Sequence, residues 1–267
     1  MDVLRRHNVT VAGTGPRTLL LAHGYGCDQT MWRSVTPALE AKYRVVLFDH
    51  VGHGKAPASH FSPARHGTLA GYARDVLEIC AALDLRDAIF VGHSVSAIIG
   101  LLAGIEEPAR FSALILIGPS PRYINDGAYV GGFTREDIDG LLELLETNPL
   151  GWARTFAPVI MSHAERPELA AELRDSFCRT DPEVARHFGR VTFLSDNRAD
   201  LSRVTQPCLV IQCAEDAIAP RHVGEYVHRH LPDSELVVLH ASGHCPHVSD
   251  PEPTLAAIQA FLGKHRG

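Results

Sequence analysis

The sequence lacks any long apolar run, and no segment approaches the ~20 consecutive apolar residues of a membrane span. The charged start, Met1 to Arg6, has no apolar stretch behind it, so a secretory signal peptide is not expected. These absences predict a soluble cytoplasmic protein that has no membrane partner.

The sequence also lacks basic runs and paired cysteines. Its 25 Lys and Arg residues stand against 31 Asp and Glu, for a net charge of -6, which argues against nucleic acid as a partner. The six cysteines contain no Cys-x-x-Cys pair, and their spacing suits neither a zinc site nor a disulfide framework. We therefore expect no metal and no cofactor.

What the chain does have is an alternation of short apolar runs with helical patterns. Its 267 residues, 45% of them hydrophobic, can bury one sizeable core, and the alternation predicts an α/β fold with a mostly parallel sheet. The predicted strands are Leu19–Ala22, Arg44–Phe48, Ala88–Val91, Ala113–Ile117, Leu209–Gln212 and Leu236–Leu239, with Val9–Ala12 as an edge strand. Helices are expected over Leu69–Leu83, Ala97–Glu106 and Thr254–Leu262.

The interval between the strands ending at Ile117 and starting near Cys208 is too long for one crossover helix. It holds four helical patterns, separated by prolines, over Arg135–Glu146, Leu150–Ile160, Pro167–Cys178 and Pro182–Phe193. Extra helices packed on the core would explain this interval, and so would a helical lid over a catalytic edge. We expect residues 1–120 and 200–267 to form the core and residues 121–199 to form a lid.

A tight turn stands between the strand Ala88–Val91 and the following helix. Its sequence, Gly92-His93-Ser94-Val95-Ser96, is close to the nucleophile elbow, in which a strained turn lifts a serine hydroxyl clear of the sheet. Gly usually occupies the position of Ser96. An ordinary serine-containing turn is the alternative interpretation of this short pattern.

The remaining parts of a Ser-His-Asp triad follow in the expected chain order. Asp216 comes shortly after the strand Leu209–Gln212, and His244 comes after the strand Leu236–Leu239. Parallel strands place such residues at one edge of the sheet, together with Ser94. Among 16 histidines, His240 and His247 compete with His244, and Glu215 competes with Asp216.

An oxyanion hole is expected beside Ser94. The loop His23-Gly24-Tyr25-Gly26 follows the buried strand Leu19–Ala22, where this architecture supplies one backbone N–H donor, and the residue after the nucleophile supplies the other. The predicted donors are the amides of Tyr25 and Val95.

Longer stretches resemble a known family. They include His23-Gly24-Tyr25-Gly26-Cys27-Asp28-Gln29, Phe48-Asp49-His50-Val51-Gly52-His53-Gly54, Ser120-Pro121-Arg122-Tyr123-Ile124-Asn125-Asp126 and Gly243-His244-Cys245-Pro246-His247. With the elbow, they resemble the α/β-hydrolases of the group that contains the bacterial stress-response regulator RsbQ and the plant strigolactone and karrikin receptors. The plant members also carry Ser at the position of Ser96.

The resemblance implies a V-shaped four-helix lid over a hydrophobic pocket, with Ser94 at its floor and Asp216 and His244 completing the triad. It suggests that Tyr25, Tyr123, Trp152, Phe156 and Phe193 line the pocket, to which we add His93, Ala217 and Cys245. Some members hydrolyse butenolide-type lactones slowly and signal through a partner protein that contacts the lid.

We therefore expect a serine hydrolase that cleaves an ester or lactone of a small hydrophobic molecule. The alternative is a ligand-sensing module whose lid is recognised by a signalling protein. Hydrolysis of a carbon–carbon bond in a β-diketone uses the same triad and remains open. Dehalogenation is disfavoured because it usually requires Asp at the position of Ser94.

Overall fold

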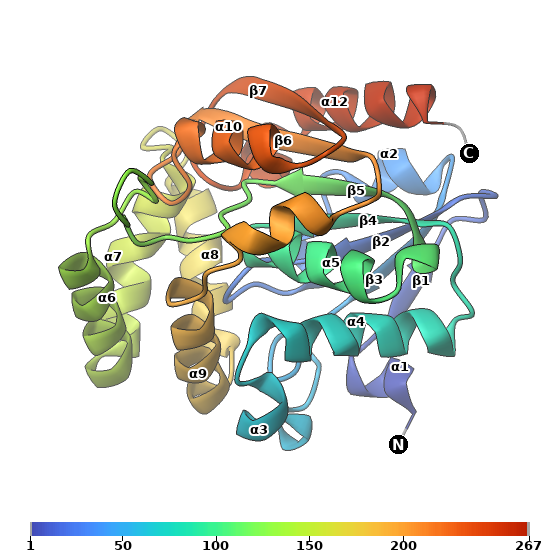
Figure 1. Cartoon of the computed structure of the whole chain (residues 1–267). Coiled ribbons are helices and arrows are strands. Elements are labelled where there is room, and N and C mark those ends of the chain that lie inside the picture. The colour runs from blue at the N-terminus through green and yellow to red at the C-terminus, as the bar shows by residue number, and fades with distance from the viewer. Residues whose placement is uncertain (1, 266–267) are drawn as a thin grey trace.

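Seven apolar segments pair into one sheet within residues 2–265, the part of the chain that the computed structural model describes. The order is β1-β3-β2-β4-β5-β6-β7, and every neighbouring pair is parallel except β1 with β3 (Figure 1). The strands are β1 (Thr10–Ala12), β2 (Thr18–Ala22), β3 (Arg44–Phe48), β4 (Ala88–His93), β5 (Phe111–Ile117), β6 (Cys208–Glu215) and β7 (Ser234–Ser242). The predicted α/β class and all predicted strands are confirmed.

Alternate residues of each central strand face opposite sides of the sheet, as the two-residue period of a strand requires. Leu20 and Phe90 belong to one apolar core, and their neighbours Leu21 and Ile89 belong to the other. Helices α4 (Leu69–Ala82) and α5 (Val95–Glu106) pack on the first face, and α12 (Pro251–Lys264) covers the second. The three helices predicted outside the long interval are thereby confirmed. Further helices that the patterns did not predict are α1 (Val3–Arg6), α2 (Thr36–Glu40), α3 (Pro63–His66), α10 (Arg221–His230) and α11 (Pro246–Ser249).

Four helices fill the long interval between β5 and β6. They are α6 (Arg135–Thr147), α7 (Pro149–Met161), α8 (Pro167–Arg179) and α9 (Pro182–Phe193), called the insertion below, and they gather at one end of the sheet (Figure 1). Proline begins α7, α8 and α9, because the first helical position needs no N–H donor. Pro158 lies inside α7 and does not end it, although prolines are expected to separate the helical patterns.

No helix among residues 2–265 is both long and apolar enough to cross a membrane.

Candidate active site

The nucleophile elbow forms between β4 and α5. Ser94 has φ 57° and ψ -125°, a region that is disfavoured for residues with a side chain and typical of strained functional turns. Gly92 is required there, because a Cβ at this position would lie 2.4 Å from the carbonyl oxygen of Ser96. The Ser96 hydroxyl donates to the His23 carbonyl and lies 2.7 Å from Nε2 of His50, so serine in place of the usual glycine is accommodated by hydrogen bonds.

The three predicted triad residues meet at the carboxyl edge of the sheet. Nε2 of His244 lies 2.8 Å from Oγ of Ser94, and Nδ1 of His244 lies 2.7 Å from Oδ2 of Asp216. All three residues are buried. An aspartate oxygen can only accept, so Nδ1 of His244 carries the proton and Nε2 is free to accept one from Ser94. This arrangement fits a catalytic triad, whereas Glu215 and His240 are exposed.

The Asp216 carboxylate is fixed by the turn that follows it. Its Oδ1 accepts from the amides of Ile218 at 2.8 Å and Ala219 at 3.0 Å. Its Oδ2 accepts from the Gln212 side chain at 3.3 Å as well as from His244. Each carboxylate oxygen therefore has a defined set of donors, which orients the group toward the imidazole.

The His244 loop is tied to the insertion. The His244 amide donates to the carbonyl of Ile160 at 2.7 Å, in the last turn of α7. Gly243, with φ +85°, is pressed against the same turn, because a Cβ there would lie 2.2 Å from the carbonyl oxygen of Met161. From the other side, Nε2 of His93 donates to the His244 carbonyl at 2.8 Å. Both the core and the insertion thus hold the backbone of His244 in place.

The loop that carries the Tyr25 amide lies directly against the elbow. A Cβ on Gly24 would sit 3.3 Å from Cβ of Ser94 and 2.6 Å from Nδ1 of His93. Val95 is the first residue of α5, where the amide has no partner within the helix. Tyr25 and Val95, whose amides are the predicted oxyanion donors, are thus next to Gly24 and Ser94, two residues that pack against each other.

A small apolar cavity of about 40 Å³ opens at Ser94. Of the predicted lining residues, Tyr25, His93, Tyr123, Trp152, Phe156, Phe193 and Cys245 all border it. Ala217 does not, because its side chain is exposed, and the next residue, Ile218, faces the cavity instead. The prediction missed Cys27, Leu141, Ile160, Leu173, Phe177 and Thr192. Only Phe177 carried a sequence signal, as an aromatic residue in a predicted insertion helix.

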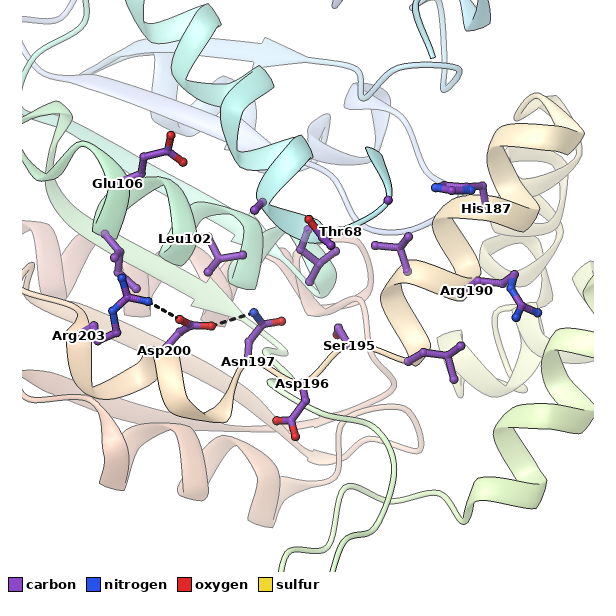
Figure 2. Close-up of a pocket in the computed structure, with 16 residues that line it drawn as sticks. Thr68, Leu102, Glu106, His187, Arg190, Ser195, Asp196, Asn197, Asp200 and Arg203 are labelled. Carbon is purple, nitrogen blue, oxygen red and sulfur yellow. Dashed lines mark hydrogen bonds and ion pairs between the residues drawn. The ribbon is translucent and has the colours of Figure 1, made fainter. Parts of the chain in front are cut away.

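A wider hollow of about 840 Å³ lies elsewhere, between α4, α5 and α9. Figure 2 shows Asp200 there, bonded to both Arg203 and Asn197. No triad residue lines this hollow, so its size does not make it the catalytic cavity. Across residues 2–265 the structure holds no group of three His, Cys, Asp or Glu residues arranged to bind a metal ion.

A family model described as "Alpha/beta hydrolase family" matches residues 19–257. The chain belongs to the alpha/beta hydrolase family. It is 40% identical to "Strigolactone esterase D14" of Arabidopsis thaliana, over 98% of this chain and 96% of that protein. It is 38% identical to "Karrikin insensitive 2 receptor CA" of Petunia hybrida, over 94% of each.

A solved structure, a hydrolase from Oleispira antarctica, is also similar, with a TM-score of 0.96 and 42% identity over 98% of this chain and 96% of that one. The resemblance stated from the motifs is confirmed by these matches. The prediction of an α/β-hydrolase that acts on ester bonds is confirmed with it.

Proposed function

We propose that this α/β-hydrolase cleaves the ester or butenolide-type lactone of a small hydrophobic molecule at Ser94. The observation that carries the proposal is the continuous hydrogen-bonded series from Ser94 through His244 to Asp216 at the floor of an apolar cavity. The similarity to a strigolactone esterase supports the lactone class.

The geometry supports the following sequence of steps. His244 takes the Ser94 proton through Nε2 as Oγ attacks the carbonyl carbon, and Asp216 stabilises the resulting imidazolium. The amides of Tyr25 and Val95 donate to the developing oxyanion. His244 then returns the proton to the leaving oxygen, and later activates the water that releases the acyl group. These steps use only side chains and backbone amides of this chain.

We further propose that the insertion acts as a lid. Residues 121–199 would then be a distinct unit over a core of residues 1–120 and 200–267. Eight residues of α6 to α9, among them Leu141, Trp152 and Phe193, border the cavity at Ser94 and support this role. All six cysteines are free thiols, which suits the reducing cytoplasm as the place of action.

The proposal is tested with a synthetic butenolide enol ether and p-nitrophenyl acetate, with product release followed by absorbance and adducts by intact-protein mass spectrometry. We expect the wild-type protein to open the butenolide and the Ser94→Ala protein to leave it intact. Failure of the wild-type protein to cleave either compound would contradict the proposal.

Asp216→Asn tests the proposed role of the carboxylate. The asparagine oxygen would keep the two amide donors of Ile218 and Ala219, so its NH₂ group would face Nδ1 of His244. This donor forces the proton of His244 onto Nε2, which can then no longer accept from Ser94. We expect kcat to fall about 10⁴-fold. The control is Glu215→Gln, an exposed neighbour, and an equal loss in both variants would contradict the assignment.

A second candidate role is a ligand-sensing module whose lid is recognised by a signalling protein. The similarity to a karrikin receptor and the bond between α7 and the His244 loop favour it. This role requires a partner that is retained on the immobilised protein with the butenolide and lost without it. Identical recoveries in the two conditions would exclude it.

A further inference from the structure

Two buried histidines outside the triad hold the loop that carries the Tyr25 amide. The imidazole rings of His23 and His50 lie edge to face, with centroids 4.7 Å apart. Neither residue borders the cavity at Ser94. Their effect on the reaction must therefore pass through the loop.

The proton of the His23 ring can be assigned from its two partners. A backbone amide can only donate, so Nε2 of His23 accepts from the His50 amide at 3.0 Å. A carbonyl can only accept, so Nδ1 of His23 carries the proton and donates to the Gly24 carbonyl at 2.8 Å. The two bonds independently require the same tautomer. Burial lowers the pKa of His23, which keeps the ring neutral and this tautomer intact.

This tautomer fixes the direction of the Tyr25 amide. In a trans peptide the carbonyl and the following N–H point in opposite directions, and residues 2–265 contain no cis peptide bond. The Gly24 carbonyl is held toward His23, with a second and longer bond of 3.3 Å from the Cys27 amide. The Tyr25 N–H therefore points away from His23. Within the described residues it has no hydrogen-bond partner, as a donor to a substrate oxygen requires.

Ser96 joins this loop to the helix that follows the nucleophile. Its hydroxyl donates to the His23 carbonyl. A hydroxyl has only one proton, so Nε2 of His50 donates to Oγ of Ser96, at 2.7 Å, and does not accept from it. Ser96 follows Val95, whose amide is the other predicted oxyanion donor, in the first turn of α5. One hydroxyl thus connects the two sides of the oxyanion hole.

Removing this hydroxyl would leave two buried polar groups without a partner. The His23 carbonyl and Nε2–H of His50 both bond to Ser96, which is itself inaccessible to solvent. Unpaired buried groups of this kind are strongly disfavoured. They can regain partners only by moving, and movement of His23 displaces the Gly24 carbonyl and the Tyr25 amide behind it.

We propose that Ser96, with His50 and His23, is a positioning residue that aims the Tyr25 amide at the oxyanion. The inference rests on the proposed function. Ser96 does not border the cavity, so it acts through the loop and not on the substrate. Loss of its hydroxyl should weaken binding of the transition state while leaving both substrate binding and the basicity of His244 unchanged.

Ser96→Ala is compared with wild-type protein on p-nitrophenyl acetate. We expect kcat to fall roughly 10- to 100-fold, less than the usual loss on removing a donor outright. KM should stay within twofold, and the midpoint of the pH profile of kcat/KM, which reports His244, should not move. The control is Thr254→Val, which removes another buried hydroxyl that donates to a carbonyl, that of Asp250, at 2.9 Å. Its rates should match the wild type within twofold.

A trifluoromethyl ketone gives a readout that a purely structural defect would not. The Ser94 oxygen bonds to the ketone carbon, the ketone oxygen becomes the oxyanion, and His244 takes the Ser94 proton. The inhibition constant of 1,1,1-trifluoro-4-phenylbutan-2-one should rise in Ser96→Ala by the factor by which kcat/KM falls. The affinity for 4-phenylbutan-2-one, which forms no stable adduct, should stay within twofold. Equal losses for the two ketones, or an unchanged kcat in Ser96→Ala, would overturn the inference.

NMR of the wild-type protein tests the same inference without a variant and without turnover. Long-range ¹H–¹⁵N spectra distinguish ring nitrogens that carry a proton from those that do not. We expect the proton of His23 on Nδ1 and that of His50 on Nε2. A proton on Nε2 of His23 would overturn the inference whether or not any ester is cleaved. If wild-type protein cleaves no ester but binds the trifluoromethyl ketone more tightly than Ser96→Ala does, the proposed function fails and the inference stands.

Discussion

Replacing Ser94 with alanine should lower kcat for ester hydrolysis by roughly 10⁵- to 10⁶-fold. The change removes the oxygen that lies 2.8 Å from Nε2 of His244, so attack on the carbonyl must come from water. Alanine retains the Cβ and the backbone of the elbow. We therefore expect the urea midpoint to stay close to that of the wild-type protein.

The matched control is Ser195→Ala. Ser195 lines the hollow of Figure 2, and its hydroxyl donates to the Thr192 carbonyl at 2.8 Å, so it takes no part in the catalytic cavity. Initial rates with p-nitrophenyl acetate and the butenolide should match the wild type within twofold. A Ser94→Ala protein that retains a tenth of the wild-type rate would remove Ser94 from the reaction.

Acid should destabilise this protein strongly as the pH falls from about 6.5 to 5, before most carboxylates titrate. Burial lowers the pKa of six histidines that are almost inaccessible to solvent: His7, His23, His50, His53, His93 and His247. The pKa falls to about 3 for His53 and His247. At neutral pH these rings are uncharged in the folded protein.

The sign of the effect follows from the unfolded chain, in which a histidine has a pKa near 6.5. The stability associated with the buried rings is complete above this value and is lost as the pH falls from 6.5 toward the lowered pKa of each ring, because in that range only the unfolded chain binds the protons. Each ring contributes about 1.4 kcal/mol per pH unit to the slope. His53 and His247 alone would together remove about 3 kcal/mol per pH unit below 6.5 from a typical unfolding free energy of about 5–15 kcal/mol, and the other buried rings act in the same direction.

Urea titrations at pH 7.5, 6.5 and 5.5 measure this slope directly. In His247→Phe the slope of the unfolding free energy against pH should drop by the contribution of one proton. Phenylalanine is a suitable replacement because neither ring nitrogen of His247 has a hydrogen-bond partner. The ring centroid of His247 lies 4.4 Å from that of Trp32, a contact that phenylalanine can keep. The exposed His240 provides the control, and His240→Gln should retain the wild-type slope. An unfolding free energy that is constant from pH 7.5 to 5.5 would contradict the argument.

The positions of the triad residues could be predicted because they depend on strand ends. Buried strands such as Leu19–Ala22 are short apolar runs, and parallel strands end at the same edge of the sheet. Ser94, Asp216 and His244 follow β4, β6 and the partly buried β7, so their approach to one another follows from topology. The elbow adds a local requirement for a small residue at Gly92, which is visible in the sequence.

The walls of the cavities could not be predicted in the same way. Whether Ala217 or Ile218 faces Ser94 depends on the turn that binds Asp216, in which the Ile218 amide is a donor. The role of Phe177 depends on how α8 lies against Tyr25 and Trp152, which are distant in sequence. The tie between α7 and His244 leaves no local signal at Ile160, because it uses backbone atoms alone.

That tie has a consequence for how such proteins diversify. Replacing the insertion with that of a relative could bring a new set of cavity side chains. The His244 loop would stay in place only if the helix replacing α7 offered a carbonyl at the position of Ile160. Because the tie uses backbone atoms alone, the side chains of the insertion can be exchanged freely as long as α7 keeps its length and its end. Insertions or deletions within α7 should therefore harm activity far more than substitutions on its surface.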